Sequence, residues 1–258
     1  HQARQIDMVG MFPFTHGILR GAGYVTGAVN FDGTNDVSAR GADLTGSADA
    51  ATWMFSMWIL PASTLGGSAV AQRNLYFAEG GYGYVRLTTA DNLLVHFESA
   101  TSSTFCTFLS TGTISSTNGW SHIAFSCDGS SGALMLRGAT NWTSTAFVST
   151  AAPDFTRVNH LIGANSTAVV SPYTGDLADF WMHMSTYIDV RANIGNYISG
   201  GKPVDLGSSG AIPTGSQPIM FFKMAAGSSG STFAVNIGSG GNFSITGALS
   251  ESTSSPSD

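Results

Sequence analysis

The sequence predicts an all-β protein, an antiparallel two-sheet jelly-roll sandwich with one short helix. Short runs of β-branched and aromatic residues recur at intervals of about ten residues from about residue 23 onward, separated by clusters of Gly, Ser, Asn and Asp. Helical periodicity is missing almost everywhere. The 258 residues are compatible with a single sandwich domain that has a core of its own.

The clearest strand runs from Trp53 to Leu60 and is apolar on both faces, so we expect a central strand covered on both sides. Further strands are predicted at residues 69–77, 82–88, 92–98, 104–109, 120–127, 133–137, 141–148, 160–163, 176–184 and 219–224. Residues 233–237 and 243–246 are predicted to form a hairpin around residues 238–242. The one predicted helix covers residues 189–198, with Asp189 as its cap and Gly200-Gly201 after its end.

These elements predict three parts of the chain. Residues 1–23 form an N-terminal arm, which is rich in Met, Val, Phe and Ile between Met8 and Ile18. Residues 24–224 form the jelly-roll domain. Residues 225–258 form the C-terminal hairpin and an extended Ser-rich tail.

Composition excludes two classes of partner. Only 10% of the residues are charged, the net charge is −6, and no run of Lys and Arg occurs, which argues against nucleic acid. No apolar stretch approaches the roughly 20 residues that span a bilayer, so we expect no membrane partner. The neutral surface suits packing against neighbouring subunits, but extracellular β-proteins in general share it, and both interpretations stay open.

The sequence predicts no catalytic apparatus, and hence a protein that is not an enzyme. Glycosidases place a pair of carboxylates around the scissile bond, but Glu79, Glu98 and Glu251 are far apart in the chain. Asp176 and Asp179 share a predicted strand, but their odd separation directs them to opposite faces. A glycosidase is therefore the least favoured class.

The two cysteines, Cys106 and Cys127, lie in apolar strand-like runs. This position favours free buried thiols, and a disulfide between them stays open.

Three patterns, in order along the chain, resemble the concanavalin A-like, laminin-G-like jelly-roll family. They are Phe31–Val37, the aromatic strand Phe55–Pro61 with Trp58, and the Trp-x-His hairpin of Gly119–Phe125 followed by Leu134–Gly138. The resemblance covers roughly residues 24–200. It implies a lectin-like sandwich.

Some relatives in this family hold a structural calcium ion near the first turn and the last strand. The resemblance implies Asp32 and Asp179 as metal ligands here, and no other cofactor. Ala178 replaces one acidic residue of the family pattern, and calcium usually needs more than one carboxylate. Solvated carboxylates at a turn and a strand end are the alternative.

A looser resemblance, based on the charge-poor, glycine-rich composition and the Ser-Pro-Ser-Asp ending, is to domains of bacteriophage structural proteins. It implies a virion protein of the capsid, head fibre or tail, located in the virion and homo-oligomeric. Its partners would be other virion subunits, bound through the N-terminal arm, and cell-surface glycans. The alternative is an extracellular carbohydrate-binding module or adhesin.

Aromatic residues near loops are the candidates for glycan contact, because sugars stack on exposed rings. Tyr82 and Tyr84 follow the Gly80-Gly81 turn, and Trp142 and Tyr173 lie in or beside polar connections. For each of the four, packing in the core is the alternative.

Overall fold

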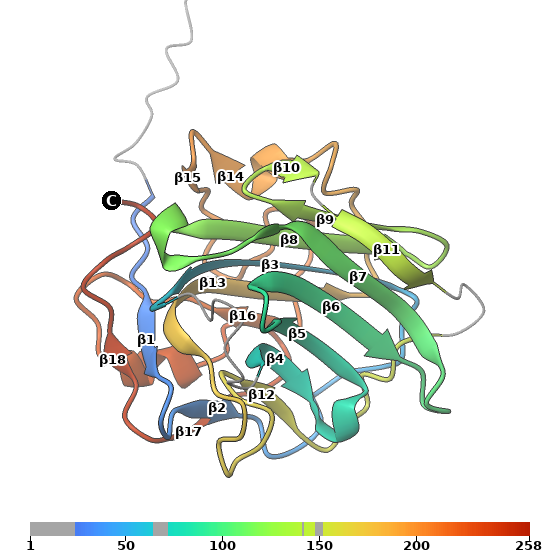
Figure 1. Cartoon of the computed structure of the whole chain (residues 1–258), viewed down its shortest axis with the longest axis horizontal. Coiled ribbons are helices and arrows are strands. Elements are labelled where there is room, and N and C mark those ends of the chain that lie inside the picture. Colours follow the sequence, from blue (N-terminus) through green and yellow to red (C-terminus); the bar gives the residue numbers. More distant parts are fainter. Residues whose placement is uncertain (1–23, 64–71, 141, 148–151) are drawn as a thin grey trace, which may run out of the picture.

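The computed structural model describes residues 24–63, 72–140, 142–147 and 152–258, with the backbone alone for residues 140 and 142–147. These residues form two antiparallel eight-stranded sheets that pack face to face (Figure 1). The predicted two-sheet sandwich is therefore confirmed.

The first sheet contains the central strand that the sequence predicts. In order across the sheet its strands are β10 (Ala139–Thr140), β9 (Gly132–Leu136), β8 (Ser121–Asp128), β3 (Thr52–Pro61), β13 (Thr174–Met184), β1 (Val29–Asp32) and β18 (Ser250–Glu251). In addition, β16 (Met220–Phe222) pairs with β13.

The second sheet contains most of the middle of the chain. Its strands in order are β11 (Trp142–Phe147), β7 (Thr104–Thr113), β6 (Asn92–Glu98), β5 (Gly83–Leu87), β4 (Arg73–Ala78), β12 (His160–Ile162), β2 (Val37–Ala39) and β17 (Ser244–Thr246). A small separate sheet pairs β14 (Ile198–Ser199) with β15 (Lys202–Pro203). Four 3-10 turns complete the described elements: η1 (Glu79–Gly81), η2 (Ser116–Asn118), η3 (Ile194–Asn196) and η4 (Gly230–Ala234).

The main core lies between the two sheets because alternate residues of each strand point inward. Trp53 of β3 is fully buried at its centre. Its ring centroid lies 4.2 Å from that of Phe97 in the opposite sheet and 4.6 Å from that of Phe125 in its own sheet.

A second apolar cluster covers the outer face of the first sheet. Met54 of β3 and Trp181 of β13 are buried there beneath Val190, Tyr197 and Leu206. The predicted covering of β3 on both faces is therefore confirmed, and the residues after β13 provide the second cover.

The helix predicted at residues 189–198 is wrong. The segment forms one 3-10 turn at Ile194–Asn196, and the described residues contain no α-helix. Gly195 lies in the middle of this turn, and so short a segment gains too few hydrogen bonds to offset the cost of helix nucleation. Ile194 and Tyr197 nevertheless pack on the first sheet.

The hairpin predicted from residues 233–237 and 243–246 is also wrong. Phe233 lies in η4, and Ser244–Thr246 pairs with β2. The reason is the buried side chain of Asn236, which accepts from the Phe221 amide at 2.8 Å and donates to the Ile219 carbonyl at 2.9 Å. This side chain takes the place of a hairpin ladder and ties the C-terminal segment to β16.

Both cysteines are free and buried, so the open alternative of a disulfide is not realised in this structure. Burial raises the pKa of Cys127 to about 11 and that of Cys106 well above its ordinary value. Both thiols are therefore neutral at physiological pH.

No helix in the described part of the chain has the length and apolar character needed to cross a membrane.

Candidate functional site

The outer face of the second sheet carries a row of polar and aromatic side chains on β5 and β6, which lie side by side in the sheet (Figure 1). Burial alternates along both strands, with Val85 and Val95 in the core and their neighbours half-buried on the other face. We call this row the polar stripe. It consists of Tyr82, Tyr84, Arg86, His96 and Glu98.

Strand register brings the members of the stripe together. Tyr84 pairs with His96, and His96 pairs in turn with Thr107 of β7. Paired residues of antiparallel strands project from the same face at close range, so these side chains meet there.

Close contacts hold the stripe in one arrangement. The rings of Tyr84 and His96 stack, with centroids 4.8 Å apart and planes 22° from parallel. The Arg86 Cζ atom lies 3.9 Å from the centroid of the Tyr84 ring. His96 uses both ring nitrogens, Nδ1 with Thr107 Oγ1 at 2.8 Å and Nε2 with Glu98 Oε1 at 3.1 Å. Such a surface loses little conformational entropy when a ligand binds.

Tyr82 extends the stripe at the turn before β5. Gly80 and Gly81 adopt positive φ values of 79° and 83°, which direct the chain through the tight turn. The Arg157 Cζ atom lies 3.9 Å from the Tyr82 ring centroid, and the Tyr82 hydroxyl lies 3.0 Å from Ser102 Oγ. The predicted pair Tyr82 and Tyr84 therefore does lie on one surface.

The stripe offers both hydrogen-bond donors and hydrogen-bond acceptors. Burial raises the pKa of Tyr84, which therefore keeps its hydroxyl proton at neutral pH. The Arg86 guanidinium donates, and the Glu98 carboxylate accepts. Sugars present the same mixture, because each hydroxyl donates and accepts.

Sequence reasoning missed Arg86, His96 and Glu98 as site residues. The signal was available, because residues two apart on a strand share a face and the predicted strands 82–88 and 92–98 contain all three. Only the pairing of those two strands, however, shows that Tyr84 and His96 are neighbours.

Two other predicted aromatic ligands do not join the stripe. Tyr173 is fully buried, its hydroxyl donates to the Asp176 carbonyl at 3.0 Å, and its ring packs edge-on against Phe31. It is a core residue, because its hydroxyl has an internal partner, and its prediction as a surface ligand is wrong. The backbone of Trp142 pairs with Ser110 on β7, and its side chain lies outside the described residues.

The two predicted metal ligands lie apart. Asp32 accepts hydrogen bonds from the backbone amides of Thr34 and Asn35, so it serves its own turn. Asp32 pairs with Thr174, and Asp179 lies five residues further along β13, about 16 Å away. Calcium ligands lie about 2.3–2.6 Å from the ion, so the two carboxylates cannot bind the same one.

Asp179 is instead a buried carboxyl group inside the fold. It accepts from Thr26 Oγ1 at 2.8 Å and from the Tyr24 hydroxyl at 3.1 Å. Burial raises its pKa from 3.8 to about 6. Its φ of 48° is uncommon outside glycine, and it lies where the register of β13 against β3 shifts.

The raised pKa of Asp179 predicts that the free energy of unfolding decreases as pH rises from about 4 to about 6, because the folded protein holds the proton more tightly than the unfolded chain. The decrease should reach about 3 kcal/mol at most. Asp179→Asn keeps the oxygen that accepts from Thr26 and tolerates the positive φ, so we expect it to remove this decrease. Urea titrations at pH 4, 5, 6 and 7 measure the effect.

The quantity to compare for Asp179→Asn is the difference in free energy of unfolding between variant and parent at each pH, because other buried groups also titrate. Burial lowers the pKa of His122 to about 3, for example, which destabilises the fold in acid. A constant difference across the four pH values would contradict the role given to Asp179.

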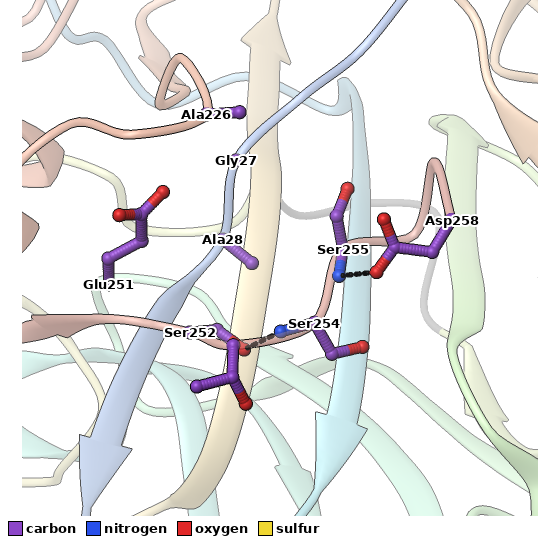
Figure 2. Close-up of a pocket in the computed structure, with 9 residues that line it drawn as sticks. Gly27, Ala28, Ala226, Glu251, Ser252, Ser254, Ser255 and Asp258 are labelled. Carbon is purple, nitrogen blue, oxygen red and sulfur yellow. Dashed lines mark hydrogen bonds between the residues drawn. The ribbon is translucent and has the colours of Figure 1, made fainter.

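Two small pockets lie away from the stripe. One, of about 180 Å³, is lined by Gly27, Ala28, Ala226, residues 251–255 and Asp258. Figure 2 shows the Asp258 carboxylate of this pocket turned to the Ser255 amide, from which it accepts at 2.7 Å. The other, of about 220 Å³, lies beside His183 and Gln217. Small-molecule sites usually measure about 300–1,000 Å³, so these two pockets are small for an extended ligand.

No group of three or more His, Cys, Asp and Glu side chains suited to a metal ion occurs within residues 24–63, 72–140, 142–147 and 152–258. The stripe itself holds two such side chains, His96 and Glu98, which contact each other.

The stacked antiparallel sheets define the class of the protein, a lectin-like β-sandwich. The chain belongs to the concanavalin A-like lectin/glucanases superfamily, because the sequence model of that family matches residues 31–186, more than half of the chain. The predicted resemblance to concanavalin A-like and laminin-G-like domains is therefore confirmed. The narrower likeness to bacteriophage proteins stays a prediction.

Several solved structures share this fold. One is a protein from Bacteroides ovatus ATCC 8483, provisionally assigned to carbohydrate binding, with 13% identity and a TM-score of 0.60 over 90% of this chain. The match covers 61% of that protein, so the chain spans about three fifths of its length. No curated protein matches the chain.

Two further structures are less similar. The CBM40 domain of the Ruminococcus gnavus IT-sialidase, bound to α2,6-sialyllactose, has 12% identity and a TM-score of 0.47 over 67% of this chain and 97% of its own. Domain 4 of an extracellular arabinanase from Geobacillus stearothermophilus, in complex with arabinotriose, has 15% identity and a TM-score of 0.46 over 65% of this chain and 75% of its own.

Proposed function

We propose that this protein is a carbohydrate-binding module that holds a glycan along the polar stripe. The observation that carries the proposal is the stacked and hydrogen-bonded set of Tyr84, His96 and Arg86 on an open sheet face. Membership in a superfamily of lectins supports it, as does likeness in fold to the Bacteroides ovatus protein assigned to carbohydrate binding. Glycan sites need hydrogen-bonding groups held at fixed positions, and this set provides them.

The proposal predicts that Tyr84→Ala weakens glycan binding by about tenfold or more, since it removes a hydrogen-bonding hydroxyl and the ring that positions His96 and Arg86. A glycan array identifies the ligands, and isothermal titration calorimetry on the best of them gives the dissociation constant. Tyr187→Ala, in the loop after β13, is the matched control and should bind as the parent does.

Two results would reject this proposal. One is a folded protein, verified by circular dichroism, that binds no glycan on the array. The other is a glycan ligand whose affinity is the same for Tyr84→Ala and Tyr187→Ala, which would place the site elsewhere on the molecule.

We also propose that the module binds glycans without cleaving them. Hydrolysis requires two carboxyl groups about 5–9.5 Å apart, and the stripe contributes one, Glu98. Its Oε1 is already engaged by His96 at 3.1 Å. Release of reducing sugar from a bound ligand during long incubation would refute this.

The virion role, the virion location and the homo-oligomer predicted from the sequence stay predictions. The arm of residues 1–23, through which subunits would join, lies outside the described residues. The charge-poor composition supports these predictions, and light scattering on the native protein tests them, because a monomer would contradict them.

A further inference from the structure

Arg86 of the polar stripe lacks a counter-charge. Within the described residues no carboxylate forms an ion pair with it, whereas Arg73, Arg157 and Arg191 each pair with an aspartate. Burial lowers the pKa of Arg86, and the neighbouring Tyr84 hydroxyl raises it. Outside the described ranges the sequence holds a single acidic residue, Asp7.

The nearest acidic member of the stripe does not compensate Arg86. The Glu98 amide donates to the Tyr82 carbonyl, which places Glu98 four residues along β5 from Arg86, about 13 Å away. Glu98 is occupied by His96 at that end. The stripe is therefore bipolar, with a free cation at one end and a partnered carboxylate at the other.

The hydrogen-bonding capacity of Arg86 is also only partly used. Its Nη2 donates to the Tyr84 hydroxyl at 3.3 Å, and its Nε has no acceptor. Asn74, the register partner of Arg86 on β4, is buried and its Oδ1 has no donor. Buried polar atoms without a partner cost stability.

We propose that Arg86 binds a carboxylate of an acidic sugar, so that the ligand of the stripe is an acidic glycan. This rests on the proposed function. A planar guanidinium matches a carboxylate with two parallel hydrogen bonds, and charge-assisted bonds of this kind are roughly twice as strong as neutral ones. Stacking on Tyr84 at 3.9 Å orients the guanidinium before the ligand arrives.

The bipolar arrangement also sets the direction of the ligand. The acidic group lies at the Arg86 end, beside Leu94 on the paired strand, and neutral hydroxyls lie at the Glu98 end, where an anion would be repelled. The net charge of −6 gives no long-range attraction for an acidic glycan. Recognition therefore depends on the local contact with Arg86.

The test is calorimetry with the full chain on three sets of oligosaccharides: neutral, uronic-acid-containing and sulfated. The best uronic-acid ligand is then compared with its methyl ester, which has the same shape without the charge. We expect the ester to bind at least about tenfold more weakly. Arg86→Gln should reduce affinity for the acid to that of the ester, and Arg86→Lys should restore part of it.

Arg137→Gln is the matched control, because Arg137 also lacks an ion pair among the described residues, and its guanidinium donates to Ser121 Oγ, on the first sheet. It should keep the preference for the acid. Binding of neutral glycans alone, or an unchanged preference in Arg86→Gln, would overturn the role of Arg86 and leave the proposed function standing. Strongest binding in the sulfated set would overturn the carboxylate assignment. Binding in none of the sets would overturn both proposals.

Discussion

Trp53→Ala is expected to lower the free energy of unfolding by about 3–5 kcal/mol, because it leaves a large cavity at the centre of the sandwich. Trp53 is fully buried, and its ring contacts Phe55, Phe97, Phe125 and Phe155 across both sheets. The rings of Phe55, Phe97 and Phe125 belong to strands β3, β6 and β8 and cannot collapse into the space without moving the backbone. Urea unfolding followed by fluorescence and circular dichroism measures the change.

Trp120→Ala is the matched control for this prediction. Trp120 is half-buried directly before β8, and its Nε1 donates to Ser254 Oγ at 2.8 Å. Trp120→Ala should lower the free energy of unfolding distinctly less than Trp53→Ala does, since solvent can fill the space that the Trp120 ring leaves. Equal losses in the two variants would mean that the core is not centred on Trp53.

Gly175→Ala is expected to destabilise the fold by about 2–5 kcal/mol, through a strained backbone and a direct clash. Gly175, the second residue of β13, has a φ of 137°, which L side chains rarely adopt. A Cβ atom there would lie 2.4 Å from the Leu60 carbonyl oxygen and 2.8 Å from the Ala62 amide nitrogen. Both atoms belong to the backbone, so one of the paired strands β3 and β13 must shift. Thermal unfolding gives the size of the effect.

Gly195→Ala provides the contrast for Gly175. A Cβ atom at Gly195 meets nothing within 4 Å, and its φ is not positive. This substitution should be neutral or slightly stabilising, because alanine lowers the entropy of the unfolded chain. If the two variants melt at the same temperature, the tight approach of β3 and β13 is not a constraint on the fold.

The strands could be predicted from local sequence because their alternation is strong. The predicted strand 92–98 and the observed β6 coincide, and the strand predicted from Trp53 to Leu60 lies within β3. Predictions failed where side chains at a distance replaced local hydrogen bonds. Asn236 bonds to β16 and prevents a hairpin, and the residues predicted as a helix spread over the first sheet as a loop with one 3-10 turn.

The candidate site was only half predictable. Tyr82 and Tyr84 stand beside a glycine turn, which is visible in the sequence, whereas His96 becomes their neighbour only when β6 pairs with β5. Tyr173 looks like a loop residue in the sequence, but the carbonyl of Asp176 satisfies its hydroxyl and allows it to enter the core. Asp32 and Asp179 resemble a ligand pair until the register of β1 and β13 separates them.

Strand periodicity and charge content are properties of neighbouring residues and of composition, so local patterns were enough to predict a two-sheet sandwich with few charged residues. Which polar residues form a site depends on how the strands pair in the folded chain. Register between strands places Tyr84 on His96, and among the residues that the structure describes no carboxylate pairs with Arg86. Both are relations between residues distant in the chain, and no local pattern specifies them.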